Sequence, residues 1–408
     1  DMINIKRIIR RKGMVGILKS LQYHLLCWDD IFWTKFIFKH LPIKDKWIFF
    51  QSEGDFSDNA KALYDYMREN LDDEFKFIWL VKNPKNYPRL KNTIFISSKP
   101  CILIGQKIKW YYAYRAKYLF FTHHAWYKNR RHEQVRINLW HGVAIKGKKG
   151  GFSHKNTFEF TLVTSDFFQV SQSAFLGCDP QKVISLGYPR NDLLQKKFDK
   201  KRLFKLLDCD SKDKIIVWMP TFRNSINKEI SEDYYYSNTG LPLLKDEEDL
   251  YELDRFMDNT NLRIVIKIHH LQASNRVFNK QYRNINILND NLLEKYRIQL
   301  YELLAHSDAL ITDYSSVYID YLLKNNPIGF ILDDYINYKR SRGFMFENPI
   351  ELMPGHHILK KEDFYNFLDE IKNEIDSFSV ERNKILKLTH KYIDANSSQR
   401  IIDYFQIK

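Results

Sequence analysis

Polar and ionisable side chains follow several apolar runs of this sequence at the point where each run ends. The run "ALIT" ends at Asp313, and two hydroxyl residues, Ser315 and Ser316, stand where a helix is expected to begin. Either serine can cap that helix, but the free amides of a helix N-terminus can also bind a phosphate. Asp320, about one turn further on, would repel a phosphate. Its carboxylate can instead accept hydrogen bonds from ribose or polyol hydroxyls, or organise the loop.

A histidine and a glycine, His141 and Gly142, follow the run "RINLW". Histidine titrates near neutral pH and can therefore act as a general base. The glycine lets the backbone turn sharply and allows a substrate to come close. A lone histidine often has a purely structural role, but His141 is the best single candidate for a catalytic base in this chain.

Three further runs end in the same way: Thr221 and Arg223 follow "IIVWMP", His269 and His270 follow "RIVIKI", and His123 and His124 follow "YLFFT". Arg223 can clamp a phosphate or pair with an acidic residue, and His269 can donate a hydrogen bond to a diphosphate. Parallel α/β sheets bind ligands at the carboxyl ends of their strands. If all five runs are strands that end at one common edge, their side chains form a site.

Strand-like and helix-like segments alternate from Lys46 onward, which is typical of parallel sheets covered by helices on both faces. Two such series are separated by the lysine-rich segment "QKKFDKKRLFKLLDCDSKDK". The sequence therefore predicts an α/β fold with two Rossmann-like, doubly wound domains at residues 46–205 and 206–385, followed by a C-terminal helix at 386–408. The acidic, tyrosine-rich segment 224–250 is interpreted as a loop or lid.

The first 45 residues form a separate basic segment. Within it, residues 3–41 combine lysines and arginines with Ile, Leu, Trp and Phe, a pattern typical of an amphipathic helix on an anionic bilayer. The alternative is an ordinary helix packed on the next domain. No run approaches the ~18–20 apolar residues that span a bilayer. We therefore expect a peripheral protein at the cytoplasmic face of the membrane.

The net charge of +14 indicates a polyanionic partner, such as nucleic acid, an anionic membrane or a phosphorylated substrate. Nucleic acid is not expected, because the basic residues form no nucleic-acid-binding motif. The four cysteines form no C-x-x-C pair, and the single D-x-D, Asp208–Asp210, lies in a lysine-rich stretch, so neither a metal nor another cofactor is expected. The chain also lacks a G-x-G-x-x-G motif and a P-loop, which argues against dinucleotide and ATP enzymes.

Several segments, taken in this order, resemble the CDP-glycerol glycerophosphotransferase family of teichoic acid and capsule synthesis. They are "SEGDFSDNAKALYDYM", "NLWHGVAIK", "SLGYPRNDLL", "VWMPTFR", "IKIHH", "ITDYSSVYIDYLLKNNPIGFILDDYINYKRSRGF" and "NSSQRIIDYF". The resemblance covers about residues 46–405, and its WHG, GYPRND and DYSS-x₃-D segments are together highly specific. Two departures are His270, where the family usually has proline, and "VAIK", where it usually has a threonine–proline pair. The first scarcely affects His269, and the second can alter acceptor preference.

The resemblance implies a GT-B fold with the active site between its two domains. It also implies transfer of a polyol phosphate from CDP-glycerol or CDP-ribitol to a hydroxyl of a lipid-linked or glycan acceptor, with release of CMP. His141 would be the base that deprotonates the acceptor, assisted by Arg223 and His269 at the donor phosphates. The other residues that we expect to bind substrate are Ser315, Ser316 and Asp320 in the donor pocket, Ser57, Asp58 and Asn59 on the acceptor side, and Asp313, Thr221 and Gly142.

Two other functions fit parts of the sequence. One is a GT-B glycosyltransferase that moves a sugar from a nucleotide sugar, and the other is a membrane-surface module that binds polyanions without catalysis. The residues do not distinguish glycerol from ribitol, priming from polymerisation, or one acceptor from another, and they leave the oligomeric state open.

Overall fold

The computed structural model describes residues 32–53, 55–99, 105–123, 131–147, 157–221, 239–268, 278 and 280–408. The chain divides into two compact units, one of Asp1–Trp140, Asn156–Thr161 and Gln406–Lys408, and one of His141–Lys155 and Leu162–Phe405. The domain boundary expected near residue 205 stays a prediction. Most of the basic N-terminal segment, residues 1–31, lies outside the described residues.

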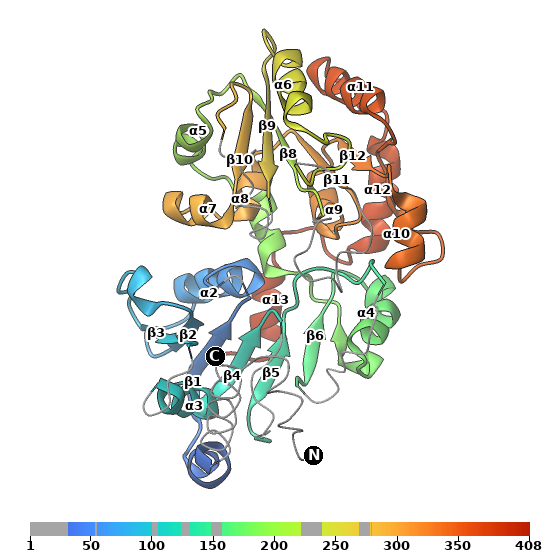
Figure 1. Cartoon of the computed structure of the whole chain (residues 1–408). Coiled ribbons are helices and arrows are strands. Elements are labelled where there is room, and N and C mark those ends of the chain that lie inside the picture. Colours follow the sequence, from blue (N-terminus) through green and yellow to red (C-terminus); the bar gives the residue numbers. More distant parts are fainter. Residues whose placement is uncertain are drawn as a thin grey trace, which may run out of the picture. The chain divides into compact units, whose positions relative to one another are not determined.

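The first sheet has seven strands in the order β3-β2-β1-β4-β5-β6-β7 (Figure 1). The strands are β1 Lys44–Gln51, β2 Lys76–Val81, β3 Thr93–Ser97, β4 Ala116–Phe121, β5 Val135–Asn138, β6 Phe160–Leu162 and β7 Val183–Ile184. The pairings of β1 with β2 and β4, of β2 with β3, and of β5 with β4 and β6 are parallel. The chain runs outward from β1 to β3 and then returns to β4 on the other side of β1. The order therefore reverses between β1 and β4, where α/β sheets of this kind bind ligands.

Aromatic side chains fill much of the core of the first unit. The ring of Phe50 on β1 stacks on Trp79 of β2 at a centroid distance of 5.2 Å and on Phe120 of β4 at 5.5 Å. Helices α2 (Asp58–Asn70) and α3 (Gly105–Arg115) belong to the same unit, as do the short helices η1 (Trp33–Ile37), η2 (Phe38–His40) and η3 (Pro84–Asn86). The sequences of the strands are nearly continuous apolar runs, because both faces of a parallel sheet are covered.

The second sheet has six strands in the order β10-β9-β8-β11-β12-β13, and all of its pairings are parallel. The strands are β8 Lys214–Trp218, β9 Leu262–Lys267, β10 Ile285–Leu288, β11 Ala309–Thr312, β12 Ile328–Ile331 and β13 His356–Ile358. Here the order reverses between β8 and β11. The two sheets and their covering helices confirm the predicted α/β class.

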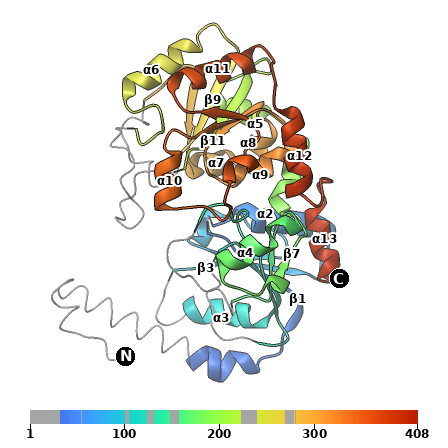
Figure 2. The same cartoon turned by 90° about the vertical axis from the view of Figure 1, so that its right-hand side faces the viewer.

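The second unit contains ten α-helices among its described residues (Figure 2). They are α4 Gln169–Leu176, α5 Lys201–Leu207, α6 Glu247–Phe256, α7 Asp290–Tyr296, α8 Leu300–Ala305, α9 Val317–Tyr321, α10 Tyr335–Ser341, α11 Lys361–Lys372, α12 Ser379–Thr389 and α13 Ser397–Tyr404. Its short helices are η4 Asp166–Phe168, η5 Pro180–Lys182, η6 Pro189–Gln195, η9 Leu322–Lys324 and η10 Pro349–Leu352. No helix in the described ranges combines the length and the apolar character needed to cross a bilayer.

Two details differ from the expectations drawn from the sequence. The end of segment 224–250, expected as a loop or lid, is helical from Glu247, because Asp246 and Asp249 form a capping box at the start of α6. Strand β13 was not expected, since its three residues include two histidines and are too few to form a recognisable pattern. Residues 222–238 lie outside the described part.

Candidate active site

The five expected strand ends do not share one edge, because they belong to two sheets. Strands β4 and β5, which precede His123 and His141, are in the first sheet. Strands β8, β9 and β11, which precede Thr221, His269 and Asp313, are in the second. Each sheet thus has its own set of polar side chains at the carboxyl ends of its strands.

The backbone on either side of His141 adopts positive φ angles. The φ angle is 55° at Trp140 and 136° at Gly142. Trp140 is held in the first unit by two hydrogen bonds: its amide donates to Asn138 Oδ1 at 3.0 Å, and its carbonyl oxygen accepts from Asn59 Nδ2 at 2.9 Å. A positive φ is costly for a tryptophan and persists where surrounding contacts enforce it. The residue before the candidate base is therefore fixed by Asn59, which was expected to bind the acceptor.

Gly142 lies against Ser316 in the second unit. A Cβ atom on Gly142 would come within 2.2 Å of Ser316 Oγ and 3.4 Å of Arg190 Nη2. The Ser316 side chain makes no capping hydrogen bond to helix α9, so its hydroxyl lies beside Gly142 without serving as a cap. Ser315 and Ser316 are both partly exposed. The fold thus brings together the WHG and DYSS segments, which are far apart in the sequence.

Asp320 is buried in a network of hydrogen bonds, with a side chain that is 1% exposed. Its Oδ2 accepts hydrogen bonds from Arg190 Nη2 at 2.7 Å and from the Tyr301 hydroxyl, and its Oδ1 accepts one from Asn191 Nδ2 at 2.9 Å. The same Arg190 nitrogen donates to the carbonyl oxygen of His141 at 3.0 Å. Of the two roles considered for Asp320, organising the loop fits this geometry better than binding a hydroxyl of the substrate.

The end of β8 is tied to the end of β11 where the order of the second sheet reverses. Asp313 is fully buried, and its carboxylate accepts hydrogen bonds from the Thr221 amide at 2.7 Å and from the Thr221 hydroxyl. Lys146 Nζ donates to Thr221 Oγ1 at 3.1 Å. Asp313 therefore fixes Thr221 at the carboxyl edge of the second sheet, while Lys146 brings a positive charge to this edge. A cation at the carboxyl edge of a parallel sheet is suited to a phosphate.

The carboxyl edge of the first sheet carries three hydroxyl groups and a carboxylate. Thr122 Oγ1 donates to Ser52 Oγ at 3.2 Å, and Ser52 Oγ is 3.5 Å from Ser57 Oγ. His123 Nδ1 lies 3.2 Å from a carboxylate oxygen of Glu53. These residues follow β1 and β4, the two strands at which the order reverses. Such groups are suited to the hydroxyls of a polyol or a sugar.

Some predicted residues have other positions. Asp58 begins helix α2 with a φ angle of 60°, directly after the N-cap residue Ser57. Arg223 and His269, two of the three predicted catalytic residues, lie outside the described residues, so their roles stay predictions. No group of three or more His, Cys, Asp or Glu side chains in the described ranges is arranged to hold a metal ion.

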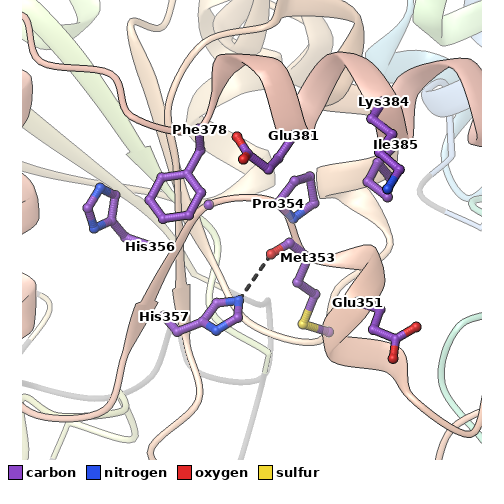
Figure 3. Close-up of a pocket in the computed structure, with 10 residues that line it drawn as sticks. Glu351, Met353, Pro354, His356, His357, Phe378, Glu381, Lys384 and Ile385 are labelled. Atoms are coloured by element: carbon purple, nitrogen blue, oxygen red, sulfur yellow. Dashed lines mark hydrogen bonds between the residues drawn. The ribbon is translucent and has the colours of Figure 1, made fainter.

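A cavity of about 380 Å³ lies elsewhere in the second unit, along β13 and α12 (Figure 3). Its lining includes Met353, Pro354, His357, Phe378 and Ile385, and His357 Nε2 is 3.0 Å from the carbonyl oxygen of Met353. None of the residues predicted from the sequence lines this cavity.

Lys146 and Tyr301 were not recognised as site residues from the sequence. Lys146 follows His141 by five positions, and a basic residue so close to a candidate base is a signal that could have been used. No feature of the sequence indicates a role for Tyr301, because it lies among leucines in the short helix α8.

Comparison with known proteins identifies the family. Residues 33–406 match the family described as CDP-glycerol:poly(glycerophosphate) glycerophosphotransferase. The chain belongs to this family. It is therefore a member of a family of transferases, as the sequence predicted.

Curated relatives of this family include enzymes of teichoic acid synthesis. The chain is 27% identical to a teichoic acid glycerol-phosphate transferase of Staphylococcus aureus, over 91% of this chain and 95% of that protein. It is 25% identical to a teichoic acid poly(glycerol phosphate) polymerase of Bacillus spizizenii, over 82% and 85%. A polymerase of the same name from Staphylococcus epidermidis is 27% identical over 81% of this chain, which spans only 46% of that longer protein.

Solved structures show the same fold. The wall teichoic acid polymerase TagF has a TM-score of 0.73 and 21% sequence identity, with coverage of 96% of this chain and 95% of the TagF chain. A TagF variant named with the ligand CDPG has a TM-score of 0.75 at 21% identity, over 95% and 97%. At this level of identity the likeness supports the GT-B-like fold and no more.

Proposed function

We propose that this chain is a glycerophosphotransferase that moves glycerol phosphate from CDP-glycerol to a hydroxyl group of a teichoic acid precursor and releases CMP. The observation that carries the proposal is the contact of Gly142 with Ser316, which places the candidate base His141 next to the predicted donor loop within one unit. The family match over residues 33–406 supplies the class of reaction.

On the donor side, the carboxyl edge of the second sheet offers a cation and hydroxyls to a diphosphate. Lys146 stands at its edge beside Thr221, and Ser316 keeps a hydroxyl that is not used for capping. Arg223 and His269 follow the neighbouring strands and would add two more donors, by the resemblance described above. Such groups stabilise the charge that develops on the phosphoryl oxygens and on the departing CMP.

In the reaction, an acceptor oxygen attacks the β-phosphorus of CDP-glycerol and forms a new phosphodiester bond. The bond between this phosphorus and the bridging oxygen breaks, and its electron pair leaves with CMP. The proton of the acceptor hydroxyl moves to His141, which acts as the general base. General-base assistance of this kind typically contributes about 10²–10⁴-fold to the rate.

On the acceptor side, we assign hydroxyl recognition to the carboxyl edge of the first sheet. The charged groups at this edge include Glu53, with His123 beside it. Carboxylates accept hydrogen bonds from hydroxyls and repel phosphates. The part of the acceptor held there is therefore a polyol or a sugar, supplied by a lipid-linked or glycan precursor.

We also propose that the enzyme works at the cytoplasmic face of the membrane. The described part of the N-terminal segment exposes Phe32, Phe36 and Ile37, which are 51%, 56% and 37% exposed, together with Lys35 and Lys39. Exposed aromatic and aliphatic side chains among lysines favour contact with an anionic lipid surface. The full chain should sediment with vesicles that contain phosphatidylglycerol and not with neutral vesicles, and Phe32→Ser/Phe36→Ser should weaken this binding.

A donor panel tests the reaction. Purified protein is incubated with a lipid-linked glycan acceptor and with CDP-glycerol, CDP-ribitol or a UDP-sugar, and the products are weighed by mass spectrometry. We expect CMP and an acceptor heavier by one or more glycerol phosphate units. CDP-ribitol is a second candidate, because a poly(ribitol-phosphate) polymerase of Bacillus spizizenii is 27% identical over 90% of this chain. UDP release from a UDP-sugar, without CMP release from either CDP-polyol, would contradict the proposal.

A further inference from the structure

Arg190 connects the candidate base to a buried carboxylate. Its side chain belongs to the GYPRND segment and is only 7% exposed. One of its nitrogens, Nη2, donates to Asp320 Oδ2 at 2.7 Å and to the carbonyl oxygen of His141 at 3.0 Å. The guanidinium also stands over the ring of Tyr301 at 4.8 Å from its centroid. The residue is therefore held by an anion, by a backbone carbonyl and by an aromatic face, all within one unit.

Asp320 has a charge partner and two further hydrogen-bond donors inside the protein. Arg190 supplies the positive charge, and Tyr301 and Asn191 supply two neutral hydrogen bonds. A buried ion pair is tolerated when additional hydrogen bonds satisfy its oxygens. This carboxylate is 1% exposed and already accepts hydrogen bonds from three donors. It therefore binds Arg190 and is not available to a substrate.

The hydrogen bond to the His141 carbonyl acts on the peptide group between His141 and Gly142. Gly142 has a φ angle of 136°, a conformation that only glycine adopts readily, so this peptide group is not fixed by its own steric preferences. The hydrogen bond from Arg190 restrains the His141 carbonyl, and the close contact with Ser316 restrains Gly142. Fixing this peptide plane fixes the direction in which the His141 side chain leaves the backbone.

We propose that Arg190 is a positioning residue for His141, with Asp320 as its counter-ion, and that neither residue contacts the donor. The inference rests on the proposed function for its activity measurement. It assigns a role to the GYPRND segment and replaces substrate binding by Asp320 with orientation of the base. A misplacement of about 1 Å at a reacting group can cost about 100-fold in rate.

The test compares Arg190→Lys and Asp320→Asn with a matched control, Arg382→Lys. Arg382 is also a buried arginine of the second unit, 1% exposed and paired with Asp376, but it is bonded to the carbonyl of Asn325 and lies outside the site. The rate of CMP release at saturating substrate, the KM for CDP-glycerol, its Kd by calorimetry and the melting temperature are measured for each full-length variant.

Arg190→Lys and Asp320→Asn should each lower kcat by about 10- to 100-fold with the KM and Kd for CDP-glycerol within about 2-fold of wild type. The double variant should be no slower than the slower single variant, because the two residues act as one unit. Arg382→Lys should lower the melting temperature about as much as Arg190→Lys does, but it should leave kcat at the wild-type value. This comparison separates positioning of His141 from general destabilisation.

Three results would overturn the inference: an unchanged kcat in both variants, a Kd for CDP-glycerol raised 10-fold or more, or an equal loss of kcat in Arg382→Lys. If a charge variant does not fold, Tyr301→Phe provides the same test. It removes one hydrogen bond from Asp320 and should give a smaller loss of kcat, again without a change in Kd. Absence of CMP release by the wild-type enzyme would instead contradict the proposed function itself.

Discussion

The Oγ atom of Ser316 lies so close to Gly142 that a Cβ added to the glycine would be 2.2 Å away from it. Residue 142 follows the candidate base, and residue 316 belongs to the predicted donor loop. Their contact explains why a glycine is needed directly after His141: any larger residue would push the two segments apart. The site therefore depends on the close contact between the Gly142 backbone and the Ser316 side chain.

Gly142→Ala should abolish most of the activity and destabilise the protein. The new methyl group meets Ser316 Oγ, and a φ of 136° is strained for alanine, so we expect a loss of about 1–3 kcal/mol in the free energy of unfolding. Gly343→Ala is the matched control, because Gly343 also has a positive φ of 72° but its added Cβ would meet nothing closer than 3.7 Å. Denaturant unfolding and CMP release are measured for both, and an equal effect of the two changes would show that steric contact with Ser316 is unimportant.

Lys146→Met should weaken the binding of CDP-glycerol. Lys146 is the cation beside Thr221 at the carboxyl edge of the second sheet, and loss of one charge contact to a phosphate should raise the Kd about 10-fold. Lys339→Met is a suitable comparison, since Lys339 is an exposed residue of helix α10 whose Nζ bonds the carbonyl of Glu347. Calorimetric titration gives both constants. A Kd for Lys146→Met equal to that of the control would remove Lys146 from the donor site.

Asp192→Ala should lower stability without a direct effect on the chemistry. The Asp192 carboxylate accepts hydrogen bonds from the amides of Ser397 and Ser398 and from the Ser398 hydroxyl, all at 2.8 Å, and so caps helix α13. Loss of a buried cap leaves these donors unsatisfied, at a cost of about 2–3 kcal/mol. Asp394→Ala, which removes an exposed partner of Arg400, should cost less than about 1 kcal/mol. Urea unfolding gives the free energy of unfolding of each variant. Equal losses in the two variants would show that Asp192 is not an important cap of α13.

The stability of the protein should fall as the pH is lowered below about 6.5, in part because of His390. Burial lowers the pKa of His390 to about 4, and the nearby Asp320 carboxylate opposes this shift only partly. The unfolded chain therefore binds a proton between about pH 6.5 and 4 that the folded chain does not bind, so stability rises with pH across this window. The contribution is about 3 kcal/mol at neutral pH.

Replacing His390 by glutamine should flatten the pH dependence of stability, even if it lowers stability at every pH. Denaturant unfolding of wild type and His390→Gln between pH 4.5 and 7.5 gives the two slopes. If the slopes were the same, His390 would not be a buried neutral histidine.

Much of the fold could be predicted from the sequence, because parallel strands covered on both faces give unbroken apolar runs. The five apolar runs that precede the candidate residues all form strands, namely "YLFFT" in β4, "RINLW" in β5, "IIVWMP" in β8, "RIVIKI" in β9 and "ALIT" in β11. Strand β13, which was not expected, has three residues and two histidines, and its place depends on pairing with β12, which no local pattern shows.

The types of residue in the site could be predicted from the sequence, but the contacts between these residues could not. The residues after "RINLW" and "ALIT" were identified as candidates because polar groups follow apolar runs there. Their contact through Gly142 and Ser316, and the hydrogen bond from Arg190 to His141, depend on how distant segments pack. The capping of α13 by Asp192, which lies about 200 residues earlier in the chain, likewise depends on packing that no local pattern shows.

The role of His141 as the general base is tested by a single-turnover measurement on His141→Ala with CDP-glycerol and a lipid-linked acceptor, combined with calorimetric binding of CDP-glycerol. If His141 is the base, CMP formation should slow by about 10²–10⁴-fold while the Kd for CDP-glycerol stays within about 2-fold of wild type. A wild-type rate of CMP formation in His141→Ala would show that His141 is not the base.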